Sequence, residues 1–177
     1  MLIEKRRIFS VFLSSTGSDL DGERQAIYEA LNRMQDCKCV RMEDFAAQPV
    51  PADVVCKNEV QLSDIFVGLV AFRHGALIDP GDMTSPSYTE LEYDSALEAK
   101  LPILMHIAPD TFKEPHHARQ NDEFLDKQLA FRDRIQAMPC TPEAWRDKEL
   151  LAMFVVLAVR QQIDHLKGIK TPPQSAP

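Results

Sequence analysis

The chain has 177 residues, of which 45% are hydrophobic and 27% charged, so it can bury an ordinary core and lacks the composition of a disordered protein. This length fits one domain, since domains typically span roughly 100–200 residues. The net charge of −7 and a pI near 5.2 exclude a generic binder of nucleic-acid backbones, which would carry a basic face. We therefore expect no nucleic-acid partner.

The sequence gives no sign of export or membrane insertion. The charged residues at 4–7 are followed by too short an apolar run for a signal peptide. The longest apolar stretch, 150–159, is about half of the ~20 residues needed to span a bilayer. We expect a cytoplasmic protein with no membrane partner, consisting of one domain at 1–167 and a linker-like tail at 168–177.

The first half of the chain alternates between strand and helix patterns. Residues 8–13 are mostly aliphatic or aromatic and precede a Ser/Thr-rich stretch, which predicts a buried strand ending in a loop. Apolar residues at helical spacing predict a helix over 20–35, and a shorter strand follows at 37–42. A helix is predicted at 52–62. Residues 64–72 form a continuous apolar run, which is typical of a strand covered on both faces.

The second half continues this alternation after a long Gly- and Pro-containing loop at 73–86. The remaining predicted elements are helices at 87–100, 119–137 and 143–166, a strand at 103–107 and a short edge strand at 139–142. Repeated strand–helix units predict an α/β fold with a doubly wound, mostly parallel five-stranded sheet. Right-handed crossovers favour the flavodoxin-like strand order 2-1-3-4-5.

In such sheets, ligands bind outside the carboxyl ends of the strands, where the strand order reverses; here this is between strands one and three. The loop after strand one contains Ser14, Ser15 and Thr16, whose hydroxyls and flexible backbone precede a helix N-terminus. Such a place favours phosphate, although the sequence has neither a Walker loop nor G-x-G-x-x-G. The competing interpretation is that these residues turn the chain and cap the next helix, for which Asp19 is another candidate.

A second polar cluster opens the helix predicted at 87–100. Ser87 and Glu90 have the spacing of a capping box, which is a complete structural account of Glu90. On a helix Glu90 and Tyr93 share a face, whereas Glu92 is turned about 200° from Glu90 at ~100° per residue. Only one of the two carboxylates can therefore face the ligand. A single carboxylate beside a loop that could attract phosphate suits chemistry at a sugar carbon, as nucleophile or as partner of an oxocarbenium-like centre.

Arg73 ends the third strand, where its guanidinium has alternative partners. It can form a structural ion pair with Glu90, Glu43 or Asp44, or it can bind a ligand phosphate. No metal site is expected, because the pair at 116–117 lacks a third ligand at metal spacing. The cysteines also lack such spacing, and we expect buried free thiols. They are Cys37, Cys39, Cys56 and Cys140.

Four segments together resemble one known family. They are V-F-L-S-S-T-x-x-D-L-x-x-E-R at 11–24, M-E-D-F at 42–45, Arg-x-Gly at 73–75 and S-Y-T-E-L-E-Y at 87–93. Their combination resembles the domain of unknown function family 4062, which is related to Toll/interleukin-receptor (TIR) domains and to nucleoside deoxyribosyltransferase-like domains. The resemblance covers about residues 7–107.

The resemblance implies a TIR-like fold with a signalling or defence role, often as one domain of a larger protein. In the related deoxyribosyltransferases a Glu attacks the sugar C1′. In catalytic TIR domains a Glu on the corresponding helix supports cleavage of the nicotinamide–ribose bond of NAD. In the deoxyribosyltransferases this Glu lies in a run like x-E-L-G-Y-A, to which Thr89 to Tyr93 are similar. The resemblance therefore gives Glu90 the catalytic role. Glu92 stands where those relatives usually have a small residue.

The sequence leaves two functions open. The first is a TIR-like nucleotide-binding domain that hydrolyses the N-glycosidic bond of NAD or a related nucleotide, with catalytic Glu90 and no metal or cofactor. Its expected ligand-binding residues are Ser14, Ser15, Thr16, Asp19, Arg73 and Tyr93. The second is a non-catalytic interaction module of a larger signalling protein, which would use the outer faces of the helices at 119–137 and 143–166. Homo-oligomers or partner protein domains are expected in both cases.

Overall fold

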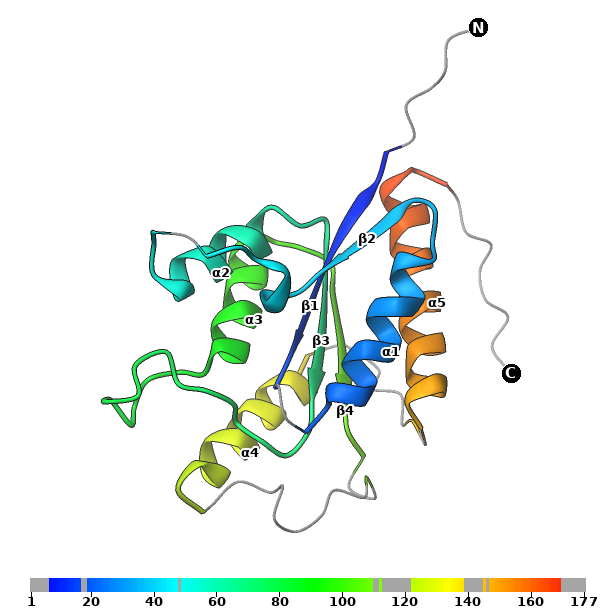
Figure 1. The fold of residues 1–177 in the computed structure, drawn as a ribbon. Helices are drawn as coiled ribbons and strands as arrows, with labels where there is room; N and C mark the ends of the chain where they lie inside the picture. Colours follow the sequence, from blue (N-terminus) through cyan, green and yellow to red (C-terminus); the bar gives the residue numbers. More distant parts are fainter. Residues whose placement is uncertain are drawn as a thin grey trace, which may run out of the picture.

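The chain folds into alternating strands and helices around one sheet (Figure 1). The computed structural model describes residues 7–16, 19–47, 49–109, 112, 122–138, 145 and 147–169. The strands are β1 (Phe9–Ser15), β2 (Cys37–Val40), β3 (Ile65–Val70) and β4 (Ile103–Ile107). The helices are α1 (Asp21–Asn32), α2 (Ala52–Gln61), α3 (Tyr88–Glu98), α4 (Asp122–Gln136) and α5 (Lys148–Leu166), with a one-turn 3-10 helix, η1 (Met42–Asp44).

The described part of the sheet has four strands rather than the predicted five. β1 pairs with β2 and β3, and β3 pairs with β4, all in parallel, which gives the order β2-β1-β3-β4. The predicted order of the first four strands is therefore confirmed. The fifth predicted strand, at 139–142, lies outside the described residues. β3 is buried along its whole length, as expected for a strand covered on both faces.

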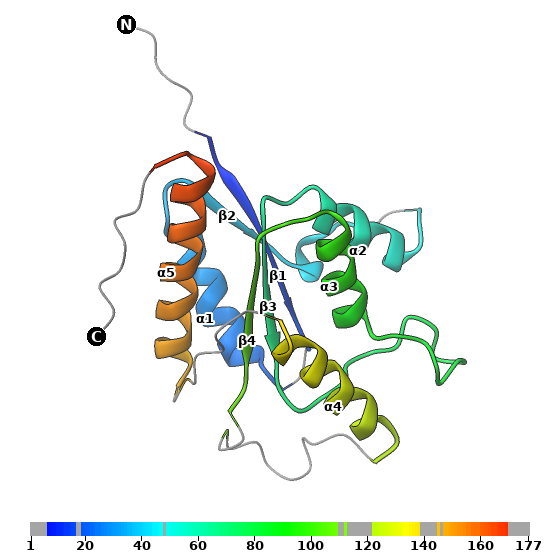
Figure 2. The same cartoon turned by 180° about the vertical axis from the view of Figure 1, so that it is seen from behind.

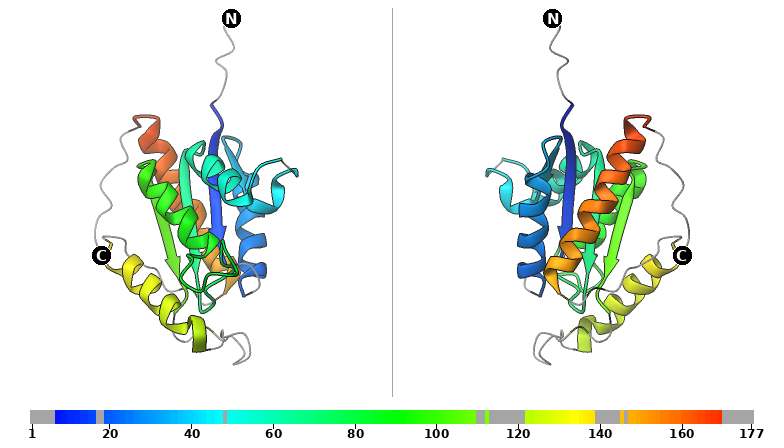
Figure 3. Two further views of the ribbon diagram at one scale, coloured as in Figure 1. Left: turned by 90° about the vertical axis from the view of Figure 1, so that its left-hand side faces the viewer. Right: turned by 90° about the vertical axis from the view of Figure 1, so that its right-hand side faces the viewer.

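Two layers of helices cover the sheet. α1 and α5 pack against each other on one face, and α2 and α3 pack on the other (Figures 1 and 2). α4 lies at the carboxyl ends of β3 and β4, where its Arg132 donates hydrogen bonds to the carbonyls of Ala71 and Ala108 (Figure 3). No helix in the part of the chain described here is long and apolar enough to cross a membrane.

The alternation of side chains along β1 sends neighbouring residues to different layers. Val11 and Leu13 join the core under α1 and α5, whereas Phe12 joins the core under α2, α3 and α4. Because successive strand residues point to opposite faces, Ser14 belongs to the α2–α3 side and Ser15 to the α1 side. The two serines thus enter different surroundings.

Two predicted boundaries are corrected by specific contacts. Ser14 and Ser15 belong to β1 rather than to the following loop, because they pair with Gly68 and Leu69 of β3. The last helix begins at Lys148 rather than near 143, because the side chain of Asp147 caps it by accepting the N–H of Leu150 at 2.8 Å. Of the predicted tail at 168–177, only residues 168 and 169 are described, so the division at 167 stays a prediction.

Candidate functional site

Glu92 and Ser14 meet at the carboxyl end of β1. The Ser14 hydroxyl donates a hydrogen bond to Oε2 of Glu92, and the thiol of Cys56 donates to Oε1 at 3.2 Å. The three residues come from β1, α2 and α3. Only 4% of the Glu92 surface is exposed, so its carboxyl group is removed from water and held by two donors.

Burial sets the protonation of this group. Loss of solvation raises the pKa of Glu92 from 4.5 to about 7, although the hydrogen bonds from Ser14 and Cys56 and the charge of Arg24 oppose the shift. Burial and the charge of Glu92 raise the pKa of Cys56 in turn, so its thiol stays protonated and remains a donor. Glu92 is therefore a carboxyl group that can gain or lose a proton near neutral pH.

Glu90 closes the N-terminus of α3. The backbone N–H of Ser87 donates to Oε2 of Glu90 at 3.1 Å, and the N–H of Glu90 donates to Oγ of Ser87 at 3.2 Å. The same Oε2 lies 3.4 Å from Nε2 of the buried His74. The predicted capping box is confirmed. The catalytic role of Glu90 stays a prediction.

Arg24 holds Ser15 on the other side of β1. Nη1 of Arg24 donates to the carbonyl of Ser15 at 3.1 Å and to its hydroxyl at 2.7 Å. Nη2 pairs with Oε1 of Glu43 on η1 at 2.5 Å. Glu43 was one of the partners expected for Arg73, and this ion pair with Arg24 was not predicted.

Asp19 joins the ends of β1 and β3. Its Oδ1 accepts the Thr16 hydroxyl at 2.8 Å, and its Oδ2 accepts the backbone N–H of Arg73 at 3.2 Å. Burial raises the pKa of Asp19, against these hydrogen bonds. Asp19 therefore does not cap α1, whose N-cap residue is Leu20, without a side-chain cap.

Tyr93 faces a different part of the core. Its ring packs edge-to-face on Phe131 of α4, with centroids 5.7 Å apart, and its hydroxyl contacts Sδ of Met138. Only 1% of Tyr93 is exposed. The predicted residues Ser14, Ser15, Thr16, Asp19 and Arg73 thus gather at the ends of β1 and β3, whereas Tyr93 packs towards α4.

Gly75 brings the loop after β3 against Thr16. Its φ of +87° lies in the region that favours glycine, and an added Cβ would lie 3.4 Å from Cγ2 of Thr16. We expect Gly75→Ala to lower the free energy of unfolding by about 1–2 kcal/mol, because alanine is strained at this φ. Urea denaturation measures this loss. As a control, Gly22→Ala in α1 should be neutral or stabilising, since its Cβ would meet only Cδ of Lys148 at 3.7 Å.

An apolar pocket of about 230 Å³ lies on the same face of the sheet as Glu92. It is lined by Met42, Phe45, Ala46, Ala47, Val50, Ala52 and Val55. The rings of Phe45 and Phe12 are 6.5 Å apart, and Phe12 precedes Ser14 by two residues on β1. Val55 also precedes Cys56, the thiol donor to Glu92. The pocket therefore adjoins the elements that hold Glu92.

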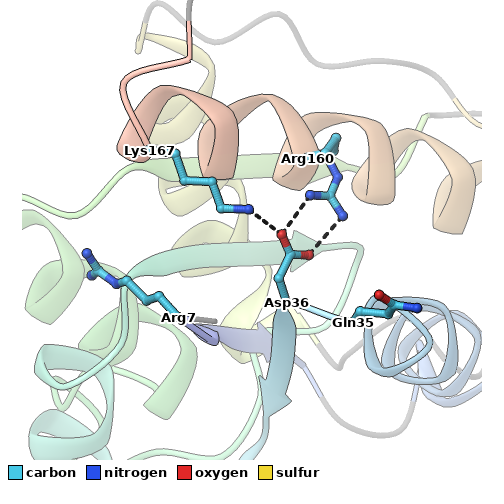
Figure 4. Close-up of a pocket in the computed structure, with 5 residues that line it drawn as sticks. All are labelled: Arg7, Gln35, Asp36, Arg160 and Lys167. Carbon is cyan, nitrogen blue, oxygen red and sulfur yellow. Dashed lines mark hydrogen bonds and ion pairs between the residues drawn. The ribbon is translucent and has the colours of Figure 1, made fainter. Parts of the chain in front are cut away.

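A larger hollow of about 410 Å³ lies at the opposite, amino ends of β1 and β2 (Figure 4). There Asp36 accepts two hydrogen bonds from Arg160, both at 2.9 Å, and one from Lys167 at 2.5 Å. These contacts hold the end of α5 to the turn before β2. Arg160 and Lys167 balance the charge of Asp36 within the chain. We therefore interpret this group of residues as a structural clamp rather than a ligand site.

We expect Asp36→Asn to lower the free energy of unfolding by about 1–3 kcal/mol at pH 7, since it leaves two cations without their carboxylate. Hydrogen bonds from Arg160 and Lys167 hold the pKa of Asp36 well below its usual 3.8. Their stabilisation is therefore complete above pH 3.8 and is lost as the pH falls further. Urea denaturation at pH 7 and pH 2.5 should show a smaller difference at the lower pH. An equal difference at both would contradict this role.

Comparisons with known proteins assign the family. The family model described as domain of unknown function (DUF4062) matches residues 10–159. The chain belongs to this family. No curated protein matches the DUF4062 chain significantly. Within the described residues of this domain, no group of three or more His, Cys, Asp or Glu residues is arranged to hold a metal ion.

The fold of this DUF4062 domain is similar to those of solved TIR domains. The TIR domains of the activated Roq1 resistosome, which directly recognises the pathogen effector XopQ, are 15% identical with a TM-score of 0.52. The match covers 85% of this chain and 99% of that one. The Clostridium botulinum CMP N-glycosidase BcmB is 10% identical with a TM-score of 0.49, covering 84% and 98% of the two chains. The match to the Roq1 TIR domains shows that the DUF4062 domain has a TIR-like α/β fold.

Two contacts of the site were missed by sequence reasoning. Glu92 was considered only as the carboxylate turned away from Glu90, and Arg24 was not singled out as a site residue. Arg24 is 7% exposed and contacts Ser15. The sequence did contain a signal for these two residues. Arg24 and Glu43 each lie in one of the four family segments, although neither contributes to an apolar pattern.

Proposed function

We propose that this DUF4062 domain binds a nucleotide at the carboxyl ends of β1 and β3 and cleaves its N-glycosidic bond. The single observation that carries the proposal is the buried carboxyl group of Glu92, which Ser14 and Cys56 hold at the end of β1 with a pKa of about 7. Perturbed carboxyl groups of this kind are typical of catalytic sites. The family resemblance to nucleoside deoxyribosyltransferases and catalytic TIR domains supports the reaction class.

The proposed chemistry uses Glu92 in its ionised form. The bond between C1′ and the base nitrogen breaks, and its electron pair leaves with the base. The positive charge that develops at C1′ is met by the Glu92 carboxylate, either as an ion partner or by forming an ester. Water then adds to C1′, displacing the Glu92 carboxylate where an ester has formed, and the proton that the water loses passes to the departing base or to solvent. In this scheme the Ser14 hydroxyl orients the carboxylate, and the apolar pocket beside η1 accepts the face of a base.

We assign the catalytic carboxylate to Glu92 rather than Glu90 because their surroundings differ. Oε2 of Glu90 already accepts the N–H of Ser87 and contacts His74, and these contacts account for its position. Glu92 has two side-chain donors and is removed from water, so its ionised form lowers the stability of the fold, as is common for catalytic carboxylates. Glu90 remains the rival assignment, and the two variants can be compared directly.

A base-release assay on the native chain tests the proposed reaction. The chain would be incubated with NAD, NADP and a panel of nucleoside monophosphates, at concentrations high enough for self-association, and free base would be quantified by chromatography. We expect base release from at least one nucleotide. Absence of free base with every nucleotide, in every oligomeric state, would contradict the reaction.

A specific surface favours the alternative function of a protein-interaction module. A groove of about 550 Å³ runs between α1 and α5, and Met153 on its wall is 49% exposed. Leu157, one turn further along α5, is 54% exposed. If this surface mediates assembly, Met153→Glu should lower the sedimentation-derived mass of the assembled protein, and Lys57→Glu on α2, outside the groove, is the control.

A further inference from the structure

Arg24 is held unequally on its two sides. Nη1 makes two hydrogen bonds to Ser15, at 3.1 and 2.7 Å, and these fix the guanidinium against the end of β1. Nη2 is held by the carboxylate of Glu43 at 2.5 Å. The Arg24 side chain is 9% exposed, whereas that of Glu43 is 53% exposed. Glu43 can therefore return to water at low cost, while Arg24 stays in place.

The edge of Arg24 that faces Glu43 has the chemistry of an anion site. A guanidinium binds carboxylates and phosphates through the same fork of N–H donors, and a phosphate dianion is the stronger partner. Arg24 contacts Ser15, which follows Ser14 on β1, and Ser14 donates to Glu92. An anion bound here would lie at the same carboxyl end of β1 as the carboxylate proposed to act at C1′.

We propose that Arg24 binds the phosphate group of the ligand and that Glu43 occupies this phosphate position until the ligand displaces it. The inference rests on the proposed function, because it takes the same end of β1 as the ligand site. It requires the substrate to carry a phosphate group, as a nucleotide does and a free nucleoside does not. It also gives Glu43 a regulatory role, since an exposed carboxylate competes with the substrate for one guanidinium.

Binding of ribose 5-phosphate tests this inference without any bond to cleave. Isothermal titration calorimetry at fixed ionic strength would compare ribose 5-phosphate with ribose. We expect the native chain to bind the phosphorylated sugar at least tenfold more tightly. Glu43→Gln should bind ribose 5-phosphate about threefold to tenfold more tightly than the native chain, because the competing charge is gone.

A neighbouring carboxylate provides the matched control. Asp44 is also on η1 but pairs with Arg41 at 3.4 Å. Asp44→Asn removes the same charge without touching Arg24, so it should change the affinity less than twofold. Arg24→Gln should weaken ribose 5-phosphate binding at least tenfold. Because Arg24 is buried and its variant can unfold, the comparison of Glu43→Gln with Asp44→Asn carries the test.

Two results would overturn the inference. One is equal affinity of the native chain for ribose and ribose 5-phosphate. The other is a Glu43→Gln variant that binds ribose 5-phosphate no more tightly than Asp44→Asn. Failure of the proposed glycosidase is seen separately, as absence of base release in a chain that still binds ribose 5-phosphate through Arg24.

Discussion

Replacement of Glu92 by Gln should reduce base release at least about 100-fold, because glutamine keeps the shape of the side chain but can neither form an ester nor balance the charge at C1′. The amide oxygen can still accept the Ser14 hydroxyl, so the variant should fold. Initial rates of base release from the best nucleotide, at pH 8 and saturating concentration, measure the effect. Circular dichroism would verify the fold.

Glu90→Gln is the matched control on the same helix. Glutamine also serves at the third position of a capping box, so the contact with Ser87 is retained. We expect its rate to stay within about fivefold of the native rate. A loss confined to Glu90→Gln, with Glu92→Gln active, would reverse the assignment and restore Glu90 as the catalytic carboxylate.

The second large effect is a gain of stability in the variant that loses activity. The pKa of Glu92 is raised from 4.5 to about 7, chiefly by burial. Between these values the folded chain holds a proton that the unfolded chain has lost, so the contribution of Glu92 to stability falls as the pH rises. The shift corresponds to about 3 kcal/mol at pH 8 and to almost nothing below pH 4.5.

Glu92→Gln removes this cost. Its free energy of unfolding, minus that of the native chain, should rise by about 3 kcal/mol between pH 4.5 and pH 8. The difference must be measured rather than the native curve, because the buried His106, whose pKa is lowered to about 4, gains stability with pH over much of this range. Urea denaturation of both proteins across this pH range checks the sign. A variant that is less stable than the native chain at pH 8 would show that the ionised carboxylate is structurally required.

The order of the first four strands and the capping role of Glu90 could be predicted because they depend on local patterns. Continuous apolar runs identified β1 and β3, and the spacing of Ser87 and Glu90 identified the cap of α3. The helical period also showed that Glu90 and Glu92 face different ways. It could not show which of them meets β1, because that depends on how α3 packs on the sheet.

Ser14 and Ser15 were predicted as one loop feature and prove to be two separate contacts. A strand sends consecutive residues to opposite faces, so the extension of β1 to Ser15 separates them. The length of β1 is set by its pairing with β3 rather than by local composition. The ion pair of Arg24 and Glu43 depends on tertiary packing in the same way, because it needs η1 to follow β2 beside α1.

The central claim is that Glu92 is the ionisable carboxyl group of a nucleotide site, and carbon-13 NMR of its side-chain carboxyl from pH 4 to pH 9 tests it most directly. The resonance would be assigned by its loss in Glu92→Gln. The account predicts a midpoint near 7 that moves when a nucleotide is added. A midpoint near 4.5, unchanged by every nucleotide, would contradict it.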